Sequence, residues 1–128
     1  MPSPNDRKYT KSHEWILIEG NTATVGLSDF AVHAIKDIVF LELPSVGKEL
    51  EQMKPFGVVE SVKAVFDLYC PLSGTVRQAN TAAMDDFDLL SKDCYGKGWL
   101  LKIDLKAMDT AHLMDAAAYD KFCAEEQH

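Results

Sequence analysis

The sequence lacks the basic charge and the long apolar runs that nucleic-acid-binding and membrane proteins need. Its 13 Lys and Arg residues are outnumbered by 20 Asp and Glu residues, which gives a net charge of −7. This balance argues against nucleic acid, whose phosphates attract a basic surface, and it disfavours anionic membranes. No apolar run approaches bilayer-spanning length. The chain has 128 residues, and we expect it to form a single domain, 1–128. We expect this domain to be a monomer that docks transiently onto larger partners.

Cysteine is also scarce. The three cysteines are odd in number and widely spaced, and no C-x-x-C occurs. A disulfide scaffold or a structural zinc site is therefore not expected, and a reducing compartment is the simpler interpretation. The first residues have neither an apolar h-region nor the Arg- and Ser-rich character of a transit peptide. We expect the bacterial cytoplasm, or the mitochondrial matrix if a presequence has been trimmed.

The usual motifs of catalysis are missing as well. His13-Glu14 starts like the zinc motif H-E-x-x-H, but Leu17 stands where the second histidine belongs. There is no G-x-S-x-G, and the seven glycines are too scattered for a phosphate-binding loop. Surface or helix-edge positions are expected for His33, His112 and His128, and a buried one for Cys70. We expect no catalytic residue and no metal.

Short apolar and alternating runs separated by Gly and Pro turns indicate a small β-sandwich or barrel with helices at its edges. The strands are expected at 8–10, 13–18, 22–27, 38–43, 55–62, 64–72, 75–79 and 99–105. Strand 38–43 is expected to be buried on both faces for most of its length. Residues 1–6 are expected to be flexible.

Three helical segments are expected. Ser28 and Asp29 are good caps for a helix that ends at Ile35. A second helix is expected around 82–89. The third is a C-terminal helical segment at 109–125, with caps at Asp109 and Asp115 and an apolar stripe that includes Ala118 and Phe122, with Tyr119 and Cys123 beside them.

A solitary lysine marks the turn between the strands at 55–62 and 64–72. Lys63 has no other cation nearby, since the flanking basic residues are Lys54 and Arg77. A turn lysine adds little packing, and its simplest explanation is a solvated side chain. The alternative is a chemical handle, because Val62 and Ala64 are small enough for an enzyme to close around the turn.

The sequence around this lysine resembles the glycine cleavage H-protein family, and the likeness extends from residue 8 to about 122. The segments that carry it are K-Y-T at 8–10, H-E-W at 13–15, A-T-V-G-L-S-D-F-A at 23–31, D-I-V-F-L-E-L-P at 37–44, G-V-V-E-S-V-K-A at 57–64, P-L-S-G at 71–74 and D-C-Y-G-K-G-W-L-L-K-I at 93–103. The resemblance implies a lipoyl/biotinyl-like fold, a flattened barrel-sandwich hybrid with peripheral and C-terminal helices.

The resemblance also implies a non-enzymatic carrier with lipoic acid joined by an amide to Lys63. The residues that would present this lysine are Glu60, Ser61, Val62 and Ala64. The implied partners are glycine decarboxylase (P-protein), which loads an aminomethyl group, aminomethyltransferase (T-protein), which removes it, dihydrolipoyl dehydrogenase (L-protein), which reoxidises the dithiol, and the lipoyl-attaching enzymes. In the family the loaded arm rests in a cleft, where an acid can hold the ammonium away from water. Glu14 is the best match for that acid, with Ser12 and Asp67 as further candidates.

The residues alone leave some alternatives open. The alternative for Glu14 is an ordinary exposed strand carboxylate, and for Asp67 a turn cap fits equally well. Departures from the family pattern occur at Val32, Lys36, Phe66, Cys94 and 84–90. Those at Phe66 and 84–90 affect the expected cleft shape and partner docking. Other functions that fit are a lipoyl domain of a 2-oxoacid dehydrogenase, a lipoyl relay or donor in protein lipoylation, and a homologue that is never modified.

Overall fold

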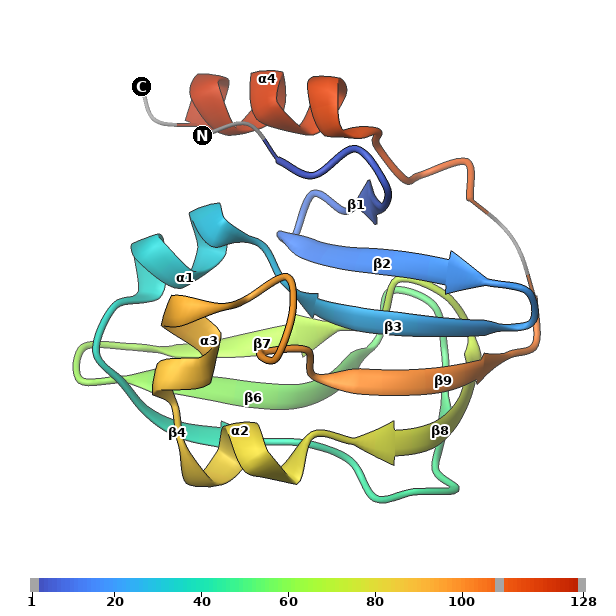
Figure 1. Cartoon of the computed structure of the whole chain (residues 1–128), viewed down its shortest axis with the longest axis horizontal. Coiled ribbons are helices and arrows are strands. Elements are labelled where there is room, and N and C mark those ends of the chain that lie inside the picture. The colour runs from blue at the N-terminus through green and yellow to red at the C-terminus, as the bar shows by residue number, and fades with distance from the viewer. Residues whose placement is uncertain (1–2, 108–109, 127–128) are drawn as a thin grey trace.

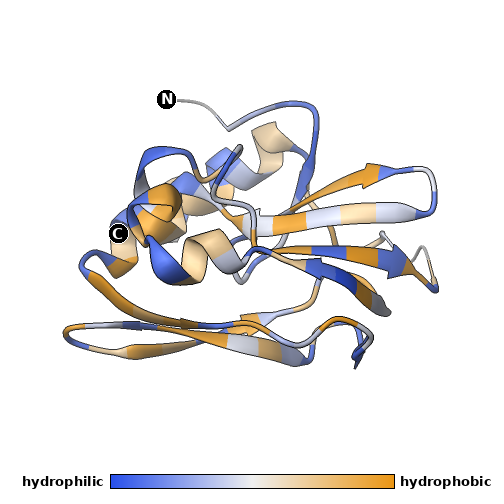
Figure 2. Cartoon of the chain, turned by 60° about the horizontal axis from the view of Figure 1, so that its bottom comes forward, coloured by the Kyte–Doolittle hydropathy of each residue, from blue (hydrophilic) through white to orange (hydrophobic). Residues whose placement is uncertain are grey.

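Two antiparallel β-sheets form the body of the computed structural model, which describes residues 3–107 and 110–126 (Figure 1). The larger sheet has six strands in the order β1-β2-β3-β9-β8-β5, and the smaller has three in the order β4-β6-β7. The strand bounds are β1 Lys8–Tyr9, β2 Glu14–Glu19, β3 Thr22–Leu27, β4 Ile38–Glu42, β5 Glu49–Leu50, β6 Pro55–Ser61, β7 Val65–Tyr69, β8 Gly74–Ala79 and β9 Leu101–Leu105. The two sheets lie one over the other without closing into a barrel (Figure 2). The expected flattened, mainly β barrel-sandwich is confirmed.

The core lies between the two sheets because each sheet buries apolar side chains on its inner face. The larger sheet contributes Val25 and Ile103, and the smaller contributes Leu41, Val59 and Leu68, all of them buried. A second cluster on the other side of the larger sheet joins Trp15 to the aromatic residues of β1 and the C-terminal helix. One glycine makes room for this cluster: a Cβ at Gly26 would lie 2.5 Å from the indole of Trp15.

Strand β4 differs from its expected burial on both faces. Its side chains are mostly outside: Val39 is 53% exposed and Phe40 is 45% exposed. The reason is its position, because β4 is an edge strand of the three-stranded sheet, and only the inner face of that sheet meets the core. An apolar run fits a half-exposed edge strand as well as a buried one, so the run could not distinguish them.

The four helices lie at the margins of the sheets (Figure 1). Helix α1, Asp29–Ile35, begins where it was expected, since the Ser28 hydroxyl accepts a hydrogen bond from the Ala31 amide at 3.2 Å. The chain leaves α1 through Lys36 and Asp37, both left-handed with φ of 51° and 39°, a conformation that favours glycine. Instead of one helix around 82–89 there are two, α2 Thr81–Asp85 and α3 Asp88–Lys92. The carboxylate of Asp86 accepts a hydrogen bond from the Asp88 amide at 3.1 Å, which restarts the chain as α3.

The C-terminal helix α4, Ala116–Glu126, is shorter than the segment 109–125 that the sequence predicts. Asp115 is its cap, because the carboxylate accepts a hydrogen bond from the Ala118 amide at 2.8 Å. The other expected cap, Asp109, lies outside the described residues. Ala118 is exposed, so its place in the buried stripe was wrong. The buried side chains of α4 are Ala116, Tyr119 and Cys123, which share one face of the helix.

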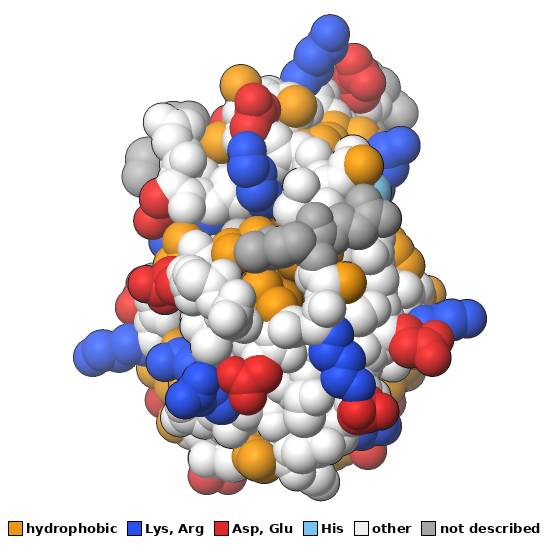
Figure 3. All heavy atoms as spheres, turned by 90° about the vertical axis from the view of Figure 1, so that its right-hand side faces the viewer, with side chains coloured by type: hydrophobic (Ala, Val, Ile, Leu, Met, Phe, Trp, Pro, Cys, Tyr) orange, Lys and Arg blue, Asp and Glu red, His pale blue; other side chains and the backbone are white. Residues whose placement is uncertain are grey.

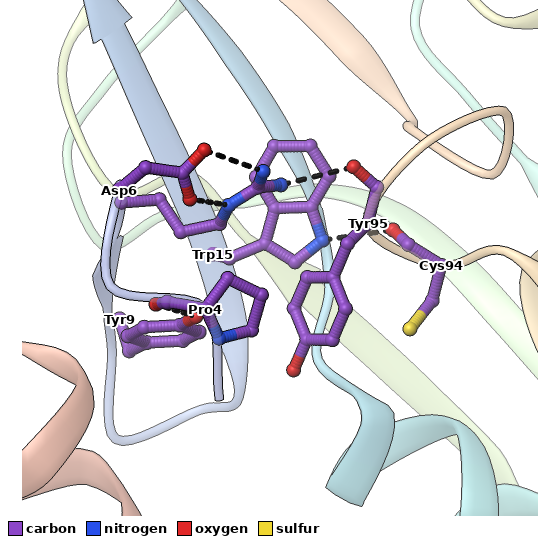
Figure 4. Close-up of polar contacts among 7 residues, drawn as sticks. Pro4, Asp6, Tyr9, Trp15, Cys94 and Tyr95 are labelled. Carbon is purple, nitrogen blue, oxygen red and sulfur yellow. Dashed lines mark hydrogen bonds and ion pairs between the residues drawn. The ribbon is translucent and has the colours of Figure 1, made fainter. Parts of the chain in front are cut away.

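The N-terminal segment is held against the body of the protein by Arg7 (Figure 4). The Arg7 guanidinium makes two hydrogen bonds to Asp6, of 2.8 and 3.1 Å, and donates a third to the Tyr95 carbonyl at 3.0 Å. It lies 4.6 Å from the ring centre of Trp15, and the indole N–H donates to the Cys94 carbonyl at 2.9 Å. Nearer the N-terminus, Ser3 also donates hydrogen bonds to the carboxylate of Asp120.

Removing this guanidinium should loosen the N-terminal segment. For Arg7→Met we expect the free energy of unfolding to fall by about 2 kcal/mol, from the lost cation–π contact and hydrogen bonds. Chemical denaturation measures the change. The matched control is Lys8→Met, at the exposed neighbouring cation, which should stay within about 0.5 kcal/mol of the wild type. Equal losses in the two variants would contradict the proposed tether.

Candidate functional site

The candidate modification site is the tip of the β6–β7 hairpin, at the left of Figure 1. Ser61 fixes the turn: its hydroxyl accepts from the amides of Lys63 and Ala64 at 3.3 and 3.1 Å, and its amide donates to the Ala64 carbonyl at 2.8 Å. A turn closed by its own serine needs no side chain from the rest of the protein. Val62, Lys63 and Ala64 are therefore all exposed, as a handle for another protein must be.

The Lys63 ammonium is available for chemistry. Among the residues that the structure describes, no carboxylate or hydrogen-bond acceptor pairs with it. Glu60 is half-buried and lies on β6, opposite Val65 on β7 and Phe40 on β4. The other end of the molecule presents acidic and basic side chains intermingled (Figure 3).

A cleft of about 490 Å³ begins two residues beyond Lys63. We call it the Glu14 cleft. Its walls are the 12–14 turn, helix α1 and strand β7, with Leu27 and Val59 at its floor. The lining residues are Ser12, His13, Glu14, Leu27, Phe30, Ala31, Ala34, Ile35, Val59, Val65, Phe66, Asp67, Leu68 and Tyr69. Because β7 is an edge strand, side chains from both of its faces border the cleft. Mainly apolar walls with a few polar groups are typical of ligand sites.

Glu14 is the polar centre of this cleft and is only 1% exposed. Its carboxylate accepts hydrogen bonds from the Thr10 hydroxyl at 2.9 Å, from the Ser12 hydroxyl and from the Tyr69 amide at 3.3 Å. Burial raises the pKa of Glu14 to about 7, and the hydrogen bonds from Ser12, Thr10 and Tyr69 oppose that rise in part. The carboxyl is thus poised between its neutral and charged forms near neutral pH. A bound cation would favour the charged form.

The sequence-predicted residues fall into two groups. Lys63 with Glu60, Ser61, Val62 and Ala64 forms the hairpin tip, and Ser12 with Glu14 lies in the cleft. Strand β7 joins the groups, and its five residues span on the order of 13 Å between the first and last Cα atoms. Asp67 borders the cleft on β7 but is exposed, and no hydrogen bond joins its side chain to Glu14 among the described residues.

Sequence reasoning missed two of the three partners of Glu14. Thr10, Ser12 and Glu14 are spaced two residues apart. In an extended chain this spacing places their side chains on the same side, and it was the available sequence signal for the contact. The Tyr69 amide carries no sequence signal, because any residue other than proline supplies the same donor. Its availability comes from the position of β7 at the edge of its sheet.

A larger hollow, of about 1130 Å³, lies between α1, α4 and the segment 91–95. Its three carboxylates are engaged by the chain itself. Asp29 is paired with His33 at 3.2 Å, Asp93 accepts from the Lys97 amide at 2.9 Å, and Asp120 accepts from Ser3. None of the residues predicted for chemistry lines it, so size alone does not identify the site.

The remaining candidates are structural. His33 is exposed on α1, and His112 is hydrogen-bonded to Gln52 at 3.0 Å and to the Pro71 carbonyl at 2.9 Å. His128 lies outside the described residues. Within 3–107 and 110–126, no three His, Cys, Asp or Glu side chains group as metal ligands, and no helix is long and apolar enough to cross a membrane.

Comparisons with known proteins point to one family. The sequence model of a family described as glycine cleavage H-protein matches residues 7–126. The chain is 52% identical over 123 residues to the glycine cleavage system H protein of Symbiobacterium thermophilum, covering 95% of this chain and 96% of that protein. It is 50% identical over 116 residues to that of Thermosynechococcus vestitus, covering 91% of each. The crystal structure of a glycine cleavage system H protein from Mycobacterium marinum matches with a TM-score of 0.86 at 37% identity, over 98% of this chain and 99% of that one.

The burial of Glu14 predicts a pH-dependent cost to stability. A carboxyl with its pKa raised from 4.5 to about 7 binds a proton more tightly in the folded state, so the folded state loses stability as pH rises from 4.5 to 7. The loss then stays constant, on the order of 3 kcal/mol. Glu14→Gln should therefore gain stability relative to the wild type across that range. Chemical denaturation between pH 4 and 8 measures the difference, and a flat difference would contradict the raised pKa.

Proposed function

The chain belongs to the glycine cleavage H-protein family, and on that basis we propose that Lys63 is the residue that carries its lipoyl group. The function is that of a lipoyl carrier in the glycine cleavage system. The observation that supports Lys63 is the hairpin turn, which Ser61 closes without help from the rest of the chain and which leaves the lysine exposed. Glu60, Ser61, Val62 and Ala64 present it to the attaching enzyme.

The residues present suit a lipoyl group. Lys63 offers an amine for an amide bond, with no ion-pair partner in the described part of the chain. The adjacent Glu14 cleft has mainly apolar walls and a volume of about 490 Å³, within the common range for small-ligand sites. When attached, lipoic acid supplies a disulfide that takes up an aminomethyl group with two electrons and is later restored by oxidation. Phe66, which departs from the family pattern, is 40% exposed at the mouth of the cleft and adds apolar surface there.

The buried carboxyl of Glu14 supplies the site for the amine of the carried aminomethyl group. An ammonium placed against Glu14 forms a charge-assisted hydrogen bond in a region sheltered from water, where such bonds are strong. Ser12 and Thr10 keep the carboxylate oriented. Asp67, exposed at the rim, adds negative charge that draws the cationic cargo towards the cleft. Sheltering the cargo slows its hydrolysis during transfer.

The carrier role calls for several partners. We assign to this chain the decarboxylating P-protein, the aminomethyltransferase T-protein, the dihydrolipoyl dehydrogenase L-protein and the enzymes that attach lipoate. The chain itself contributes no catalytic group, acts as a monomer and works in the bacterial cytoplasm. Its net charge of −7 aids encounter with basic docking surfaces on these enzymes.

The attachment site is tested by Lys63→Arg, which keeps the charge but cannot form the amide. Protein produced in a lipoylating host should have the unmodified mass, and glycine cleavage in the reconstituted system should fall to background. Lys54→Arg is the matched control, at an exposed lysine just before β6, and it should be lipoylated like the wild type. A lipoylated Lys63→Arg protein would place the group elsewhere.

The cargo site is tested by Glu14→Ala on the lipoylated protein. Loss of a charged hydrogen-bond partner, worth about 1.5–3 kcal/mol, should shorten the lifetime of the loaded form by about tenfold or more. The lifetime is followed by formaldehyde release after removal of the decarboxylase. Lipoylation of Lys63 should be unchanged, because Glu14 lies outside the hairpin. An unchanged lifetime would rule out the role assigned to Glu14.

A further inference from the structure

The hydroxyl of Tyr119 lies where three separate parts of the chain meet. Tyr119 comes from α4 and is 1% exposed. Its hydroxyl oxygen is 2.7 Å from Nδ1 of His13 and 2.5 Å from the hydroxyl of Ser28. His13 lines the Glu14 cleft and precedes Glu14 directly. Ser28 does not line the cleft but caps α1, which forms another wall. One hydroxyl from the C-terminal helix thus contacts a residue of one wall and the cap of the helix that forms another.

The wall at His13 is under conformational strain. His13 has a φ of 71°, a left-handed value that costs an ordinary residue about 1–2 kcal/mol. Its amide donates to the Thr10 carbonyl at 3.0 Å, and its carbonyl accepts from the Ser28 amide at 3.0 Å. This conformation turns the chain so that Ser12 and Glu14 both face the cleft. The contacts of the His13 side chain help to hold a backbone state that would otherwise be unfavourable.

The wall that α1 forms depends on Ser28. Its hydroxyl caps α1 by accepting from the Ala31 amide at 3.2 Å, and α1 supplies Phe30, Ala31, Ala34 and Ile35 to the cleft. The Phe30 ring also packs on the His13 ring, with 4.7 Å between centroids. The position of the Ser28 cap therefore sets where the α1 wall stands relative to the 12–14 turn.

The hydrogen atoms of this junction can be assigned without conflict. In one consistent assignment, the Ser28 hydroxyl donates to the Tyr119 oxygen while accepting from Ala31, and the Tyr119 hydroxyl donates to Nδ1 of His13. Burial raises the pKa of Tyr119, so the phenol keeps the proton that it donates. The Tyr119 ring is fixed independently by stacking on Tyr9, at 4.6 Å between centroids and 8° between planes.

We propose that the Tyr119 hydroxyl is a positioning group for cargo retention, which joins the His13 side chain of the Glu14-bearing turn to the cap of α1, beside their backbone hydrogen bond, and so holds the shape of the Glu14 cleft around the carried amine. The proposal rests on the role of Glu14 given above. It assigns to α4 a part in protecting the cargo, although α4 lies outside the hairpin that carries Lys63. Tyr119 acts through His13 and Ser28 and does not itself line the Glu14 cleft.

The test compares two variants that each remove one buried phenolic hydroxyl from the same stacked pair. In Tyr119→Phe the bonds to His13 and Ser28 are lost. In the matched control, Tyr9→Phe, the lost bond is the one to the Pro4 carbonyl at 2.7 Å. Both variants should unfold at lower denaturant concentration than the wild type, and Tyr119→Phe at the lower of the two because it loses two hydrogen bonds and Tyr9→Phe loses one. Only Tyr119→Phe should shorten the lifetime of the loaded form, by about fivefold or more.

A second measurement reads the geometry without cargo. In the unlipoylated protein, NMR should show that Tyr119→Phe shifts the Glu14 carboxyl and Tyr69 amide resonances, while Tyr9→Phe leaves both in place. Lipoylation of Lys63 should be equal in the two variants. If Tyr119→Phe does not fold, His13→Asn serves instead, because asparagine tolerates the left-handed conformation while the bond from the imidazole to Tyr119 is removed.

The outcomes separate this proposal from the one it rests on. If Glu14→Ala shortens the lifetime but Tyr119→Phe behaves like Tyr9→Phe in both measurements, the positioning role is wrong and the cargo site stands. If Glu14→Ala has no effect, the cargo site is wrong, and the positioning role for cargo retention fails with it. A shortened lifetime with shifted Glu14 and Tyr69 resonances, confined to Tyr119→Phe, supports the proposal.

Discussion

The burial of Glu14 is the constraint on which the rest of the site depends. A carboxyl that is removed from water has to be hydrogen-bonded or neutral, and here it is surrounded by two hydroxyls and an amide. Those donors come from the 10–14 turn and from β7, so the turn and the edge of the smaller sheet must lie side by side. The packing of the two sheets is what brings them together. Such a group lowers stability at neutral pH, and the cargo-binding role proposed for it is one that needs a sheltered negative charge.

A carrier places opposite demands on neighbouring parts of one strand. In the proposed role, Lys63 has to be reachable by several enzymes, whereas the cargo has to be kept from water. The fold meets both demands with β7, which starts at the exposed hairpin tip and ends at Tyr69, whose amide donates to the buried Glu14. Because β7 is an edge strand, its free side is open to a flexible arm. The hairpin needs only Ser61 to shape its turn, so Lys63 is presented without obstructing the cleft.

The sequence allowed most strands, the Ser28 cap and the exposed lysine turn to be predicted, because alternation, capping and turn chemistry are local signals. Three features were not local. The exposure of β4 follows from its place at a sheet edge, which an apolar run such as 38–43 cannot reveal. The burial of Glu14 depends on β7, distant in sequence, and the hydroxyl of Tyr119 reaches its partners only after α4 has packed. The resemblance to a family identified Glu14 as a candidate, but its hydrogen-bond partners required the structure.

The carrier role explains why all three cysteine thiols are buried. In a protein that bears a reactive disulfide, an exposed cysteine thiolate could attack that disulfide and form a mixed disulfide with it. All three thiols are buried, and burial raises the pKa of Cys70 to about 11 and of Cys94 to about 12. Cys70 follows Tyr69 of the cleft directly, and its thiol donates to the Leu72 carbonyl at 2.9 Å. A thiol held in this way can fill the core beside the Glu14 cleft without exchanging with a lipoyl disulfide that the proposed function places there.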